Sequence, residues 1–166
     1  MRDASSASRT RRIAVMSMSI ALAAAGSLIK IPSPVGTVAL DSWPGYACAL
    51  VLGPVGAWVA LAGHLASGSV AGFPLGLAIH GVIAAEMVFC ALAFRWVTGR
   101  FGAVPGVVAA VVLNGLVAPF ALLPWLEFPL VLTLLLPLTV AAAVNVSLAA
   151  VVARAVKRGF VVPGRP

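Results

Sequence analysis

The chain has 166 residues, of which 62% are apolar and only 9% are charged, and its formal net charge is +7. This composition leaves too little polar surface for a soluble globular domain, so it excludes that class and indicates a membrane protein. The basic residues flank apolar runs without forming a basic face, which disfavours nucleic-acid binding, and Cys48 and Cys90 form neither a disulfide framework nor a zinc motif.

The positions of the positive charges predict the topology. All but one of the 11 lysine and arginine residues fall in three clusters, at residues 2–12, 95–100 and 154–165, and Lys30 is the exception. Long, almost uncharged apolar stretches separate the clusters. Lysine and arginine concentrate in the cytoplasmic loops of membrane proteins, so each cluster marks a segment that we expect in the cytoplasm.

The first element is a basic tail, residues 1–12, which we expect in the cytoplasm, followed by a membrane span over residues 13–29. A cleavable signal peptide is the competing interpretation, because basic residues, an apolar run and small residues also occur there in that order. The small residues recur at four-residue intervals, however, which creates two flat helix faces suited to close packing by another helix. These faces are Ser17, Ala21 and Ala25, and Ser19, Ala23 and Ser27.

The distribution of charge predicts how many spans the middle of the chain forms. Residues 30–43 contain prolines and a glycine that break the helical pattern, so we expect a structured loop there. The apolar run at 45–65 is either one span kinked at Gly53 and Pro54 or two spans joined there. Two spans place every basic cluster inside and only Lys30 outside, whereas one span places the second and third clusters outside.

Three further spans follow, at residues 75–94, 104–123 and 130–152. We therefore predict an all-α membrane protein with a single six-transmembrane-helix bundle over residues 13–158. Both termini, including the short tail 159–166, are expected in the cytoplasm. The second and third spans are short for a hydrocarbon core about 30 Å thick, unless they extend to about residues 37 and 69.

This topology places three loops outside, at residues 30–43, 67–74 and 124–129. They hold most of the unusual polar and aromatic residues of the chain, including Asp41 and Trp43. An aromatic face next to a hydrogen-bond acceptor suits a flat heterocycle. The sequence therefore predicts a pocket that opens outward.

Ionisable side chains within spans cost at least a few kcal/mol, so His64, His80 and Glu86 need an explanation. The two histidines flank the same glycine-rich outer loop and are expected to face one cavity, as ligand-binding or as structural groups. Glu86 lies on a different helix face from His80, and it either contacts a ligand or joins helices through Asn114 or Arg95. Their spacing matches no metal motif.

Asn114 and Asn145 lie in the middle of the fifth and sixth spans, where an amide either bridges helices or binds a ligand. The closest approach to a catalytic arrangement is Ser67 or Ser69 with one of the histidines. The Gly-x-Ser-x-Gly elbow and an orienting carboxylate are missing, as is a phosphate-binding loop. We expect no catalytic residues, no metal and no cofactor, and any energy from ATP must come from a partner.

Four segments carry a family resemblance: IPSPVGTVALDS at 31–42, LGPVGA at 52–57, GHL at 63–65 and AGFPLG at 71–76. Together they resemble the substrate-binding S component of an energy-coupling factor vitamin transporter, over nearly the whole chain. The LGPxG turn is shared by many S components. The first and last segments look most like the subgroup assigned to α-ribazole, a benzimidazole nucleoside precursor of cobalamin.

The resemblance implies a six-helix protein with a vitamin pocket near its outer face. It implies that the first helix, through Ser17, Ala21 and Ala25, docks on a transmembrane coupling subunit that joins two cytoplasmic ATPases. We expect the substrate-binding residues to be Asp41, Ser42, Trp43, His64, Phe73, His80, Glu86 and Asn145. The rival interpretation is a structural or assembly subunit of a membrane complex, in which these polar groups only bridge helices and bind no small molecule.

Overall fold

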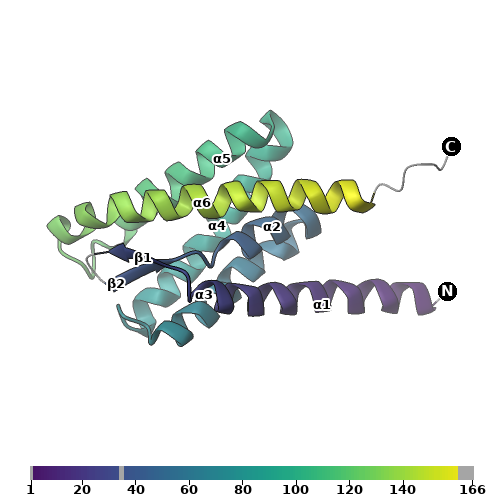
Figure 1. The fold of residues 1–166 in the computed structure, drawn as a ribbon, viewed down its shortest axis with the longest axis horizontal. Helices are drawn as coiled ribbons and strands as arrows, with labels where there is room; N and C mark the ends of the chain where they lie inside the picture. Colours follow the sequence, from purple (N-terminus) through teal and green to yellow (C-terminus); the bar gives the residue numbers. More distant parts are fainter. Residues whose placement is uncertain (1, 34–35, 161–166) are drawn as a thin grey trace.

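The computed structural model describes residues 2–33 and 36–160 and is mostly helical (Figure 1). Six α-helices, three shorter helical segments and two strands make up the described chain. In order they are α1 (Arg2–Gly26), β1 (Lys30–Ser33), β2 (Gly36–Ala39), α2 (Trp43–Leu52), the 3-10 helix η1 (Pro54–Ala57), α3 (Trp58–Ala71), α4 (Leu77–Phe101), α5 (Ala103–Val111), the π-helix η2 (Val112–Val117), the 3-10 helix η3 (Ala118–Leu122) and α6 (Phe128–Phe160).

Three helical stretches among the described residues are long and apolar enough to cross a membrane: Leu77–Phe101, Ala103–Leu122 and Phe128–Gly159. They turn large apolar side chains outward, as at Phe89, Val104 and Leu136, which are 71 to 75% exposed. Such surfaces suit lipid and not water, and a helix satisfies its own backbone hydrogen bonds in hydrocarbon. The protein is therefore membrane-embedded and helical.

The N-terminal segment is one continuous helix. α1 begins at Arg2, so the predicted basic tail continues directly into the predicted span as helix. It ends at Gly26, where an added Cβ would lie 2.5 Å from the Leu40 carbonyl oxygen. The uncharged part of α1, from Ile13 onward, is shorter than the roughly 20 residues that span a bilayer.

The predicted structured loop at 30–43 contains a short antiparallel hairpin, which the sequence did not predict. β1 pairs with β2 from Lys30 opposite Ala39 to Ser33 opposite Gly36. Pro32 blocks helix formation but is tolerated in a two-stranded ribbon, in which both strands are edges.

The run at 45–65 forms two helices and not one kinked helix. α2 ends before Gly53, whose φ of +83° is a conformation that favours glycine, and α3 follows η1. The two helices pack side by side, and their backbones come so close that a Cβ at Gly45 would lie 2.5 Å from the Ala60 Cα. Their 10 and 14 residues correspond to about 15 and 21 Å of helix, so each is shorter than the hydrocarbon core.

The elements are arranged along one long axis with distinct ends (Figure 1). The start of α1 and the end of α6 lie at one end, together with the basic last turn of α4, and the hairpin with Lys30 lies at the other. Between them is a core of small residues around an edge-to-face contact of Tyr46 and Phe94, whose ring centroids are 5.7 Å apart. The alanines of this core let the helices approach closely.

Candidate functional site

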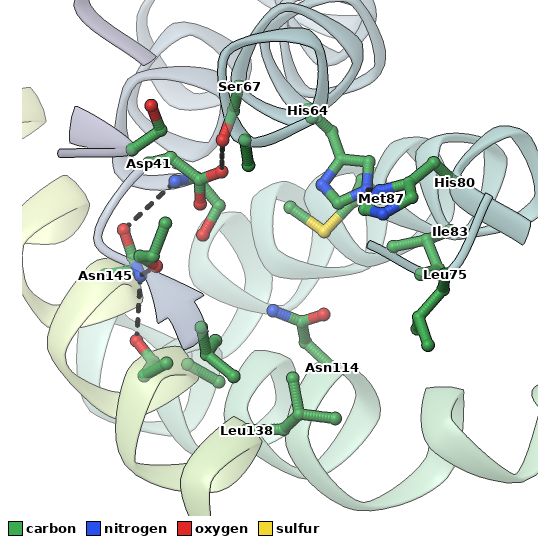
Figure 2. A pocket seen from close by; sticks show the side chains of 18 of the residues that line it. Asp41, His64, Ser67, Leu75, His80, Ile83, Met87, Asn114, Leu138 and Asn145 are labelled. Atoms are coloured by element: carbon green, nitrogen blue, oxygen red, sulfur yellow. Dashed lines mark hydrogen bonds between the residues drawn. The ribbon is translucent and has the colours of Figure 1, made fainter. Parts of the chain in front are cut away.

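A cavity of about 160 Å³ lies toward the hairpin end of the bundle (Figure 2). Its lining comes from Ser27 after α1, β2 and the β2–α2 junction, the end of α3 and the turn after it, the first half of α4, η2, η3 and α6 as far as its middle. Polar groups gather on two sides: Asp41, Ser67 and Asn145 on one, and His64 and His80 on the other. The apolar part of the lining is formed by Leu75, Ile83, Met87, Leu122, Leu134 and Leu138.

Asp41 is the acidic group of the cavity, and it stands just before α2. The buried hydroxyl of Ser67 on α3 donates a hydrogen bond to its Oδ2. Burial raises the pKa of Asp41 from 3.8 to about 6, an effect that the hydrogen bond from Ser67 partly offsets. The carboxyl group can therefore accept hydrogen bonds from a ligand near neutral pH, and it can bind one as a neutral acid in mildly acidic solution.

Asn145 anchors this side of the cavity. Its Oδ1 accepts hydrogen bonds from the backbone N–H groups of Ser42 and Trp43, at 3.1 and 3.0 Å. Its Nδ2 donates to the carbonyl oxygens of Ala39 and Ala141, at 3.3 and 2.9 Å. Both donors and both lone pairs of the amide are used, so Asn145 positions the β2–α2 junction and has no capacity left for a ligand.

The two histidines form a pair at the opposite side. Nε2 of His64 and Nδ1 of His80 are 3.1 Å apart, and the rings are stacked at a centroid distance of 5.2 Å. One nitrogen carries the shared hydrogen and the other must accept it, so the contact requires at least one neutral imidazole. Nε2 of His80 is buried and has no hydrogen-bond partner among the described residues.

The turn between α3 and α4 supports this pair. Phe73, at a φ of +47°, places its ring edge-on to His80 at a centroid distance of 5.2 Å. A Cβ at Gly68 would lie 2.7 Å from the Phe73 ring and 3.3 Å from Nδ1 of His80. Glycine at position 68 is therefore what lets the phenyl ring and the imidazole approach α3.

Asn114 reaches the cavity from η2, between the two polar groups (Figure 2). No hydrogen bond from its side chain to another described residue is present. It lies in a π-helical segment, and such segments are frequent at functional sites. The adjacent Gly115 packs on α6, where Thr139 Oγ1 donates to its carbonyl oxygen at 3.3 Å. The contact between helices that the sequence allows for Asn114 is thus made by Gly115. The amide of Asn114 remains available to bind a ligand.

Five of the eight predicted substrate-binding residues line the cavity: Asp41, Ser42, His64, His80 and Asn145. The other three do not. Trp43 packs against the hydrophobic core, and Phe73 supports His80 from outside the lining. Glu86 is not among the residues that line the cavity, and its predicted partner Arg95 donates instead to the Ala49 carbonyl oxygen at 3.2 Å.

The sequence offered Ser67 as a candidate nucleophile or as an ordinary loop residue, whereas the structure pairs it directly with Asp41. Ser69 donates to the Ala66 carbonyl oxygen and is exposed. The apolar walls carry no local signal, because they come from helices far apart in the chain. No group of three histidine, cysteine or acidic residues that could hold a metal ion occurs in the described part of the chain.

The two small-residue faces of α1 have different surroundings. The face of Ser19, Ala23 and Ser27 packs inward: Ala23 is 1% exposed, and Cys48 on α2 donates to Ser19 Oγ at 3.2 Å. The face of Ser17, Ala21 and Ala25 is exposed.

Comparisons with protein families, with curated proteins and with solved structures found no match to this chain.

Proposed function

We propose that this protein is the substrate-binding S component of an energy-coupling factor importer in a bacterial membrane. Its substrate is a vitamin or vitamin precursor, with α-ribazole or a related cobalamin precursor as the first candidate. The observation that carries the proposal is the cavity, which combines apolar walls with two groups of polar side chains, one around Asp41 and one at the histidine pair. Ligand sites typically combine such walls with a few placed polar groups. The family assignment itself rests on the sequence motifs.

The proposed topology has six membrane crossings and cytoplasmic termini. The gathering of the basic residues at one end of the bundle, with Lys30 at the other, supports it. The short helices α2 and α3 cross as a packed pair, flanked by the hairpin on the outer side. In this orientation the cavity lies near the outer face.

The polar groups suit a hydroxylated heterocycle. The Asp41 carboxylate accepts hydrogen bonds from hydroxyl groups. The imidazoles and the free amide of Asn114 can form hydrogen bonds with the nitrogens of a heterocyclic ring. The cavity of about 160 Å³ is smaller than the roughly 300 Å³ at which ligand pockets usually begin. A benzimidazole riboside therefore needs the cavity to widen, and the two-stranded hairpin, held to α6 through Asn145, is the smallest element that could shift.

The protein itself performs no ATP hydrolysis in this proposal. A transmembrane coupling subunit with two cytoplasmic ATPases supplies the energy, and the exposed face of Ser17, Ala21 and Ala25 is its docking surface.

The test is ligand binding by the purified full-length protein in detergent. Thermal unfolding is measured against a panel of vitamins and their precursors, including α-ribazole. A ligand at one hundred times its dissociation constant should stabilise the protein by about 2.7 kcal/mol. Asp41→Ala should weaken binding by about 10- to 100-fold, since a hydrogen bond to a charged group contributes about 1.5–3 kcal/mol.

Glu127→Ala is the matched control, because it also removes a carboxylate but lies outside the cavity, in the exposed turn before α6. Its affinity should equal that of the unaltered protein. Unchanged affinity in Asp41→Ala would show that the ligand binds elsewhere. A panel without any stabilising compound, together with purification in a stable complex, would favour the structural-subunit interpretation.

A further inference from the structure

A second cavity lies at the opposite end of the bundle, where α2, α4 and α6 end and α5 begins. Its volume is about 580 Å³, which is within the range of small-molecule sites. The proposed vitamin-binding function does not use it. It is lined by Leu50, Thr98, Ala103, Ala150, Ala153, Arg154, Lys157 and Arg158. We call these eight residues the basic groove.

One wall of the basic groove is cationic. Arg154, Lys157 and Arg158 are three and four positions apart on α6, so they share one helix face. All three are exposed, and none makes a hydrogen bond or ion pair to another described residue. The lining contains no carboxylate, so the positive charge is not compensated within the groove. An anion placed there would gain three favourable charge interactions.

The remaining lining is almost entirely apolar. Leu50 and Ala153 are 7% and 1% exposed, and Ala103 and Ala150 add further small apolar surface. The residues that follow Ala103 and Ala150 of this apolar floor in the sequence, Val104 and Val151, are 75% and 66% exposed. In a membrane-embedded protein such exposed valines contact acyl chains, so lipid lies close to the groove.

We infer that the basic groove binds an anionic phospholipid, with the head-group phosphate against Arg154, Lys157 and Arg158 and an acyl chain along the apolar floor. The combination decides the occupant, because a free phosphate uses the cations but gains nothing from Leu50 and its neighbours. Basic residues at the membrane surface attract anionic lipid, and a pocket between helices adds apolar contact to that attraction. The site is independent of the ligand cavity, which lies at the hairpin end.

The experiment uses the full-length protein, delipidated in detergent and titrated with phosphatidylglycerol or with phosphatidylcholine, with bound lipid counted by native mass spectrometry. Phosphatidylglycerol should bind at least tenfold more tightly. Removing one cation should lower the affinity for phosphatidylglycerol by about a factor of five. The triple variant Arg154→Gln/Lys157→Gln/Arg158→Gln should therefore bind this lipid about a hundredfold more weakly.

The matched control is Arg9→Gln/Arg12→Gln/Arg100→Gln, which lowers the net charge equally but leaves the groove intact. Its affinity for phosphatidylglycerol should fall by less than fivefold. Ala103→Phe fills the floor without changing charge, so it should weaken phosphatidylglycerol binding while leaving the weak binding of inorganic phosphate unchanged. If the groove triple variant does not give a monodisperse helical protein, Lys157→Gln replaces it, with an expected fivefold loss.

Three results would overturn the inference. Equal losses in the groove and control variants would show general attraction by net charge. Equal affinity for the two lipids would remove the role of the cations. Thermal stabilisation by millimolar inorganic phosphate as large as that by phosphatidylglycerol, insensitive to Ala103→Phe, would identify a soluble anion as the occupant.

Discussion

The side chain of Asn145, on α6, caps the N-terminus of α2. Ser42 precedes α2 but makes no side-chain cap, and the first backbone N–H groups of a helix need acceptors. The amide of Asn145, 103 positions away, accepts from Ser42 and Trp43 and donates to Ala39. One side chain on α6 thereby fixes the β2–α2 junction, and with it the position of Asp41 in the cavity.

Asn145→Ala should lower the free energy of unfolding by about 2–4 kcal/mol, because it leaves several buried backbone groups without partners. Asn145→Asp keeps an acceptor for Ser42 and Trp43 but sets an oxygen against the carbonyl oxygens of Ala39 and Ala141, so it should lower the stability by at least as much. Ser147→Ala, an exposed site on the same helix, is the control and should change stability little. Thermal unfolding in detergent measures all three. If Asn145→Ala were as stable as the control, the cap would have no energetic role.

At the scale of elements, the pair α2 and α3 depends on close backbone approach. Gly45 faces the Ala60 backbone, and a Cβ at Gly56 would lie 2.1 Å from the Cys48 carbonyl oxygen. Two helices as short as these offer few side-chain contacts, so a small interhelical distance is needed to gain enough packing. The same logic holds for Gly115, where η2 approaches Thr139 on α6.

Gly45→Ala should therefore lower the free energy of unfolding by about 1–3 kcal/mol, because the added methyl group meets backbone that must move. The same substitution at Gly99 on α4 meets nothing within 4 Å and should be neutral or should stabilise by about 0.5–1 kcal/mol. Thermal unfolding of the two variants side by side measures the difference. Equal effects at both sites would mean that α2 and α3 can separate without loss.

For the whole molecule, charge and shape agree. Basic residues concentrate at the end where α1 begins and α6 ends, so the bundle has one cationic end and a hairpin end that holds Lys30. A membrane protein orients its basic end to the cytoplasm. In the proposed topology the ligand cavity and the basic groove lie toward opposite faces of the membrane.

Cysteine accessibility in intact cells tests this orientation. Arg100→Cys and Lys157→Cys should resist a membrane-impermeant thiol reagent until the cells are opened, whereas Lys30→Cys should react at once. The natural Cys48 and Cys90 are both buried and should contribute little background. Labelling of Arg100→Cys from outside would overturn both the topology and the placement of the cavity at the outer face.

Hydropathy and charge were sufficient to predict a helical membrane protein, because the affinity of a segment for lipid depends on its own residues. They also predict that His64 and His80 face one cavity, since a short turn joins their helices, and the structure places the rings in contact.

Only the tertiary structure decided the rest. The sequence did not predict the hairpin at 30–39 or the basic groove. It also did not predict that backbone groups use all the hydrogen bonds of Asn145, or that Trp43 and Glu86 lie outside the lining of the cavity. Each depends on which helix lies beside which, and in lipid that choice is made by packing and interhelical hydrogen bonds between residues distant in the chain.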